Sequence, residues 1–208
     1  MDRTLALTKN NYYNKGLTLL ELLIAIAIFS LMLIGFSSID IFSRYHVVTS
    51  DRRVKLQNDA SYVLEHMTKN ITGTATRGGA IGDINNPPIK IFYTIEGVNK
   101  IIIIRINVDW NNNGKWDGTS GTSPDKQIAY RYNSANYEIW YYSDYSGSPA
   151  DYEILSSKIT AFTPTYSSSN DYLEVELSAC WDPAQPSSPD NPCLSMKNRI
   201  SMPAVSTH

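Results

Sequence analysis

The sequence predicts an α+β protein, in which a long N-terminal helix packs its second half on a domain of antiparallel strands. Two observations carry this prediction. Residues 17–36 form an apolar stretch of 20 residues, and a helical repeat of apolar residues continues it to about residue 69. Beyond residue 87 the chain changes to short alternating segments rich in Ile and Tyr, which are typical of strands. The 208 residues have room for one membrane segment and one modest globular domain.

The N-terminal segment has the composition of a leader followed by a membrane helix. Residues 1–16 are polar and carry three basic residues against Asp2. The apolar stretch then matches the roughly 20 residues that a helix needs to cross a bilayer. We expect residues 17–40 to form the transmembrane half of the helix. The positive-inside bias places the leader in the cytoplasm and the rest of the chain outside the inner membrane.

Three other interpretations of the apolar stretch are open. A secretory signal peptide would be cut after the stretch, where residues 35–38 offer only a weak site. A plain single-span anchor explains the hydrophobicity but not Glu21, because a carboxylate inside a membrane segment is costly and marks a functional position. A buried helix of a soluble protein fits poorly with the length of the stretch and the basic leader.

Residues 15–21 read KGLTLLE and resemble the prepilin signal of type IV pilins and type II secretion pseudopilins. The resemblance implies that a prepilin peptidase cleaves after Gly16 and methylates the new amine of Leu17, where the family usually has Phe. It also implies that Glu21, fifth in the mature chain, neutralises the terminal amine of a neighbouring subunit. The implied partners are other pilin or pseudopilin subunits, the prepilin peptidase, the inner-membrane assembly platform and membrane lipid.

Residues 41–72 are expected to form an amphipathic continuation of the helix. Apolar residues recur at spacings of three and four, which predicts a stripe that packs on the globular domain. Gly73 and the pair at 78–79 are expected to end the helix. We interpret His46 and His66 as ordinary surface or packing residues. No proline stands in the region 35–38, which favours a continuous helix, as in pseudopilins and some minor pilins. The stripe consists of Leu56, Ala60, Val63, Leu64, Met67 and Ile71.

Residues 73–208 are expected to form a β-rich domain outside the cytoplasm. Two pairs of strands are separated by polar turns, so we expect two hairpins. The order of elements is similar to that of minor pseudopilins of the J type and pilus-assembly proteins of the W type. The predicted strands cover residues 89–96, 100–108, 128–132, 137–142, 159–166, 172–178 and 199–202.

A loop at residues 109–117 has the spacing of oxygen ligands found in EF-hand calcium loops. Gly114 stands where such a loop turns sharply, and Lys115 would offer its carbonyl. Ser120 replaces the bidentate Glu of a tight site, so the sequence predicts weak calcium binding. The alternative is a turn whose Asn side chains cap their own backbone. The candidate ligands are Asp109, Asn111, Asn113, Lys115 and Asp117.

The two cysteines, Cys180 and Cys193, could form a disulfide, a redox pair or half of a metal site. Their spacing is too long for a CxxC motif, and the segment between them contains four prolines. We favour a disulfide that closes this loop, which implies an oxidising compartment.

Composition and motifs exclude several function classes. The formal net charge of −2 gives no support to nucleic acid binding. No hydrolase, metalloprotease, P-loop or dinucleotide motif is present, so we expect no enzymatic activity. The favoured function is a structural subunit, a minor pilin or pseudopilin. The alternatives are an adhesin, a DNA-uptake pilin or a major pilin.

Overall fold

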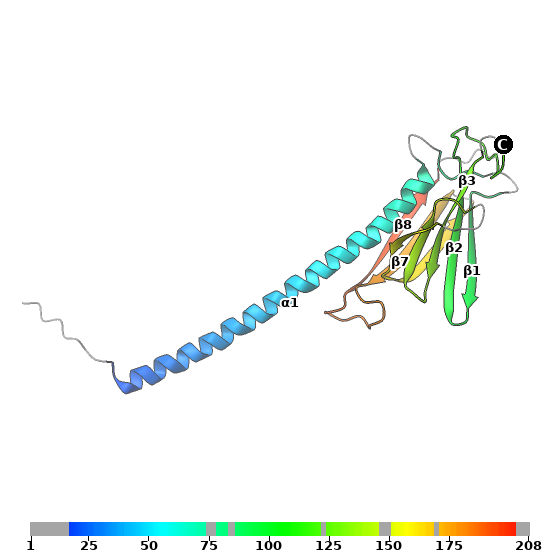
Figure 1. Cartoon of the computed structure of the whole chain (residues 1–208). Coiled ribbons are helices and arrows are strands. Elements are labelled where there is room, and N and C mark those ends of the chain that lie inside the picture. Colours follow the sequence, from blue (N-terminus) through cyan, green and yellow to red (C-terminus); the bar gives the residue numbers. More distant parts are fainter. Residues whose placement is uncertain are drawn as a thin grey trace, which may run out of the picture. The chain divides into compact units, whose positions relative to one another are not determined.

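Figure 1 shows a computed structural model of the chain. The structure describes residues 17–73, 78–82, 86–121, 124–145, 151–168 and 171–202. It separates into two compact units, residues 1–47 and 48–208. Every buried residue of the described chain lies in the second unit, which therefore contains a hydrophobic core of its own.

One continuous helix, α1 (Leu19–Thr72), accounts for all the helical residues of the described chain. This confirms the expectation that no break interrupts it. The helix ends at Gly73, whose φ of 88° lies in the left-handed region that favours glycine. A Cβ at residue 73 would lie 2.6 Å from the backbone nitrogen of Gly79, so no larger side chain fits at this turn.

The predicted apolar stripe is buried as expected. It begins at Leu56, and no earlier residue of α1 is buried. Full burial of one such aliphatic side chain stabilises a fold by about 1.5–3 kcal/mol. The buried residues of α1 are Leu56, Ala60, Val63, Leu64, Met67, Asn70 and Ile71.

The first sheet is an antiparallel meander of five strands in chain order. From Ile102 to Ile106 in the second strand, buried side chains alternate with half-buried ones, as the pleat requires. Ile102, Ile104 and Ile106 on the second strand face the core. The strands are β1 (Ile89–Glu96), β2 (Asn99–Val108), β3 (Lys126–Asn133), β4 (Glu138–Tyr142) and β5 (Glu153–Ser156).

The second sheet consists of β6 (Ile159–Ser167), β7 (Tyr172–Cys180) and β8 (Cys193–Ser201), again antiparallel and in chain order. Its buried side chains join those of α1 and the first sheet in one hydrophobic cluster. The Tyr132 hydroxyl donates a hydrogen bond to the Thr160 carbonyl at 3.0 Å and so links the two sheets. Burial raises the pKa of Tyr132 to about 12, so this hydroxyl remains a donor even in alkaline solution where an exposed tyrosine loses its proton.

Polar contacts fix the second half of α1 on both sheets. The Tyr130 hydroxyl of β3 donates to the His66 carbonyl at 3.2 Å and accepts from the Asn70 amide at 3.0 Å. On the other side, the Asn198 amide of β8 donates to the Thr68 hydroxyl at 3.0 Å. Figure 1 shows β8 beside this cyan end of the helix. His66 is thus a packing residue, as the sequence suggested.

Replacing Tyr130 with Phe is expected to lower the free energy of unfolding of residues 48–208 by about 1–2 kcal/mol. The ring stays in place, but the buried Asn70 amide loses an acceptor. Urea denaturation measures the change. Tyr152→Phe is the matched control, because the Tyr152 side chain is half-exposed. Equal stability of the two variants would show that the buried hydroxyl contributes nothing.

The strands differ from the expectation in three places. β5 was not predicted. The last strand begins at Cys193 instead of residue 199, because the disulfide starts its pairing with β7. Ile89 and Ile95 share one face of β1, but only Ile89 is buried, and Ile95 is 76% exposed. β1 is an edge strand, and the residues of its second half stay exposed.

Candidate functional site

The first unit presents an apolar helix surface that the unit itself does not cover. None of the residues 17–47 is buried. In the described chain, α1 alone is long and apolar enough to cross a membrane. Water disfavours so much exposed apolar area, and such a surface is typical of a segment that lipid or other helices cover. The side chains at least 60% exposed include Leu17, Leu19, Leu20, Phe29, Leu31, Ile34, Phe36, Ile39, Ile41 and Phe42.

Glu21 closes a capping box at the start of this helix. Its Oε2 accepts hydrogen bonds from the Thr18 backbone nitrogen at 2.9 Å and the Thr18 hydroxyl at 2.8 Å. The Glu21 backbone nitrogen in turn donates to the Thr18 hydroxyl at 3.3 Å. This reciprocal pattern satisfies N–H groups that lack helical partners. Gly16 lies outside the described residues, and Leu17 directly precedes the box.

The few polar groups in the apolar segment find partners within the helix. The hydroxyls of Ser30, Ser37 and Ser38 each donate to the carbonyl four residues earlier, at 2.7–2.9 Å. Such bonds satisfy a hydroxyl that no water can reach. Charge returns at Asp40, which pairs with Arg44 at 2.9 Å on the exposed surface. The helix can therefore lie in lipid from residue 22 to residue 39 without an unpaired polar side chain.

The second predicted site, at residues 109–117, folds as a loop capped by its own side chains. Asp109 accepts from the backbone nitrogens of Asn113 at 3.1 Å and Gly114 at 2.8 Å. Asn111 and Asn113 donate their amides to Oδ2 of Asp117, which lowers the pKa of that carboxyl. The side-chain oxygens of Asn111 and Asn113 also accept from the backbone nitrogens two residues later, at 3.0 and 2.8 Å. The Asn side chains therefore cap their own backbone, as in the alternative to calcium binding.

Asp125 belongs to this loop and was missed at the sequence level. It is 1% exposed and accepts from the backbone nitrogens of Trp110 at 2.9 Å and Asp117 at 2.8 Å. Burial raises the pKa of this carboxyl, and the nearby Asp109 raises it further. No spacing rule connects residue 125 with the loop. Only the pairing of β2 with β3 brings it there.

Calcium binding by the loop stays a prediction. No three carboxylate, imidazole or thiol groups gather around one point in the described chain. Asn111 and Asn113 would have to turn their amide oxygens inward to act as ligands, which the near-symmetry of the amide allows. With millimolar calcium, we expect the melting temperature of residues 48–208 to rise by a few degrees. Asp117→Ala should abolish the rise and the distant Asp171→Ala should retain it. An unchanged melting temperature in wild type would remove the calcium site.

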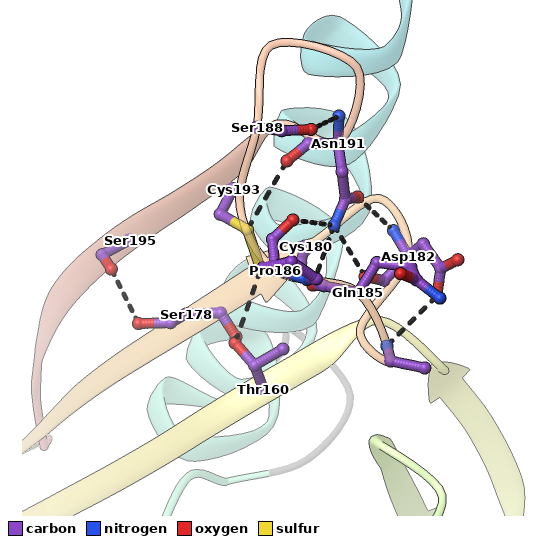
Figure 2. The surroundings of a disulfide bond; sticks show 11 residues. Thr160, Ser178, Cys180, Asp182, Gln185, Pro186, Ser188, Asn191, Cys193 and Ser195 are labelled. Atoms are coloured by element: carbon purple, nitrogen blue, oxygen red, sulfur yellow. Dashed lines mark hydrogen bonds between the residues drawn. A yellow bond between two sulfur atoms is a disulfide. The ribbon is translucent and has the colours of Figure 1, made fainter.

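The segment after β7 is closed by the predicted disulfide between Cys180 and Cys193 (Figure 2). The buried Asn191 side chain fills the loop. Its oxygen accepts from the Asp182 backbone nitrogen at 2.7 Å, and its amide donates to the carbonyls of Asp182, Gln185 and Pro186. Residues of this loop and Arg52 of α1 line an open cavity of about 380 Å³.

Comparison with known protein families gives a match at the N-terminus. Residues 11–37 match the family described as the Prokaryotic N-terminal methylation motif. The match covers the capping box and most of the apolar helix, and it supports a type IV pilin-like or pseudopilin subunit. The searches of curated proteins and of solved structures found no match to the chain.

Proposed function

We propose that the chain is a structural subunit, a minor pilin or pseudopilin, of a type IV pilus-like filament or a type II secretion pseudopilus. The observation that supports this proposal is the methylation motif on an apolar helix whose residues 17–47 are all exposed. The motif supports a structural role for the chain.

The N-terminal helix would serve first as an anchor and then as the assembly element. Before assembly, lipid of the inner membrane covers residues 17–40, and the C-terminal domain lies outside the cytoplasm. The disulfide supports this orientation, because disulfides persist in oxidising compartments. In the filament, the same apolar surface packs against the helices of other subunits.

Glu21 would select the position of the subunit in the filament. In the single chain, Thr18 donates two hydrogen bonds to the Glu21 carboxylate. Thr18 directly follows Leu17, which would be the new N-terminus. Cleavage after Gly16 places a positive amine on Leu17. We propose that the carboxylate neutralises the amine of a neighbouring subunit, because an unpaired charge between apolar helices is unfavourable.

Mass spectrometry of the mature chain from its native membrane tests the proposed function. The expected first residue is Leu17, and its amine is expected to be N-methylated. Deletion of the prepilin peptidase gene should restore residues 1–16. An unprocessed leader in wild-type cells, or a new N-terminus near residues 35–38, would contradict the proposal.

The remaining candidates differ in what a gene deletion removes. Deletion of a minor subunit that initiates or stabilises a filament should reduce the number of filaments. Deletion of an adhesin or DNA-uptake pilin should leave the filaments in place and remove only attachment or uptake. Deletion of a major pilin should remove the filaments altogether, and a major pilin should be the most abundant protein in them.

A further inference from the structure

The face of the first sheet that is turned away from the core carries two arginines, Arg105 on β2 and Arg131 on β3. Both lie on the face opposite to the core isoleucines at positions 102, 104 and 106 of β2, because neighbouring residues of a strand point to opposite faces. Arg105 pairs with Ala129 and Arg131 pairs with Ile103 in the strand register. The two arginines are therefore diagonal neighbours, with α-carbons about 7–8 Å apart.

Both guanidinium groups lie over aromatic rings. The central carbon of Arg105 lies 4.9 Å from the ring centre of Phe92 and 5.1 Å from that of Tyr145. The corresponding distance from Arg131 to the Trp140 ring is 5.0 Å. Such contacts fix the plane of a guanidinium and leave its N–H edge free to meet a planar anion.

Neither arginine has an acidic partner within the described chain. No ion pair or hydrogen bond connects either guanidinium with a described residue, and their Nε atoms are the two buried side-chain polar atoms of the described chain without a partner. The terminal Nη atoms are unpaired too but not buried, so they reach solvent. Native proteins pair most buried donors, so two unpaired ones on one face require an explanation.

We infer that this surface, the Arg105–Arg131 face, docks an acidic segment of a neighbouring protein subunit. One Asp or Glu carboxylate of that segment would accept two N–H groups from each arginine. Arg, Trp and Tyr are the residue types that dominate binding energy at protein interfaces, and all three stand together here. That the neighbour is a filament subunit rests on the proposed function. That its docking segment is acidic rests only on the two arginines.

The arrangement favours an acidic protein over a nucleic acid. Single-stranded nucleic acids bind by stacking bases on free aromatic rings. Here one side of Trp140 is taken by Arg131, and Tyr152 stacks on the ring at 4.7 Å. Phe92 and Tyr145 both contact Arg105. The net charge of −2 also disfavours a polyphosphate partner.

A titration of residues 48–208, which form a compact unit with its own core, tests the chemistry. The probes are a ten-residue glutamate peptide and an oligo-dT of equal charge, at low salt. The NMR signals of the arginine Nε–H groups report binding. We expect the peptide to shift the signals of Arg105 and Arg131 saturably and more strongly than the oligonucleotide. Tighter binding of oligo-dT, or no shift with the peptide, would overturn the inference.

Variants separate docking from folding. Arg105→Gln with Arg131→Gln should weaken peptide binding at least tenfold, and Arg53→Gln with Lys69→Gln, exposed on α1, should leave it unchanged. Arg105→Met with Arg131→Met should also lose binding, while the melting temperature falls by no more than about 4 °C, because Met can pack on the same rings. Retained binding in either arginine variant would contradict the assignment.

A cell experiment distinguishes this inference from the proposed function. A photo-crosslinking amino acid replaces Thr94, an exposed residue next to the Arg105–Arg131 face, in the full chain. We expect an adduct with a subunit that carries a prepilin signal, and its loss in the Arg→Gln pair. If processing at Leu17 occurs but the adduct is unchanged in the variant, the docking face is wrong. If Leu17 is not the mature N-terminus, the proposed function fails instead.

Discussion

Replacing Glu21 with Gln is expected to leave the chain processed and membrane-bound but to abolish its incorporation into filaments. Gln is the informative choice because its side-chain oxygen can still accept from the Thr18 nitrogen and keep the capping box. The substitution therefore removes the charge while the start of the helix is preserved. Without that charge, the amine of the neighbouring subunit has no carboxylate between the apolar helices.

Immunoblots of sheared filaments and of membranes measure this effect, and mass spectrometry verifies that Leu17 remains the first residue. Asp40→Asn is the matched control, because Asp40 is an exposed carboxylate on the same helix with an intrachain partner, Arg44. It should incorporate normally. Thr18→Val removes the cap hydroxyl and keeps the charge, so it should also assemble. Wild-type levels of Glu21→Gln in filaments would refute the pairing role.

Features with a regular period along the chain could be predicted from the sequence. The stripe from Leu56 to Ile71 repeats at helical spacing, and the buried isoleucines of β2 stand in a strongly apolar run. β5 was not predicted because its four residues are too few to show a period. β8 was predicted too short because Asn198 interrupts its apolar alternation. In the fold that amide meets the Thr68 hydroxyl, so a polar residue is tolerated at an inward position.

Features that depend on strand register could not be predicted. Arg105 and Arg131 stand 26 positions apart in the sequence, and only the pairing of β2 with β3 makes them neighbours. The same pairing brings Asp125 to the loop that begins at Asp109. By contrast, Thr18 and Glu21 show the S/T-x-x-E signature of a capping box directly in the sequence. The signature predicts the local contacts of Glu21, which accompany the assembly role that the family resemblance implies.

Replacing Cys180 and Cys193 with Ser is expected to lower the free energy of unfolding of residues 48–208 by about 3 kcal/mol. The two cysteines face each other where β7 and β8 meet, and 13 positions separate them. A cross-link that closes a loop of roughly this length removes conformational entropy from the unfolded chain and contributes about 3 kcal/mol. The melting temperature should fall by about 6–12 °C.

Reduction provides the matched control for this substitution. A phosphine reductant should lower the melting temperature of the wild-type unit to that of the double Ser variant and should not affect the variant itself. Asn191→Ala separates the covalent contribution from that of the loop's hydrogen bonds, because it removes the side chain that holds three carbonyls and leaves the disulfide in place. If reduction leaves the melting temperature unchanged while Asn191→Ala lowers it, the hydrogen bonds of Asn191 hold the loop. The disulfide would then be a mark of the oxidising compartment and not a source of stability.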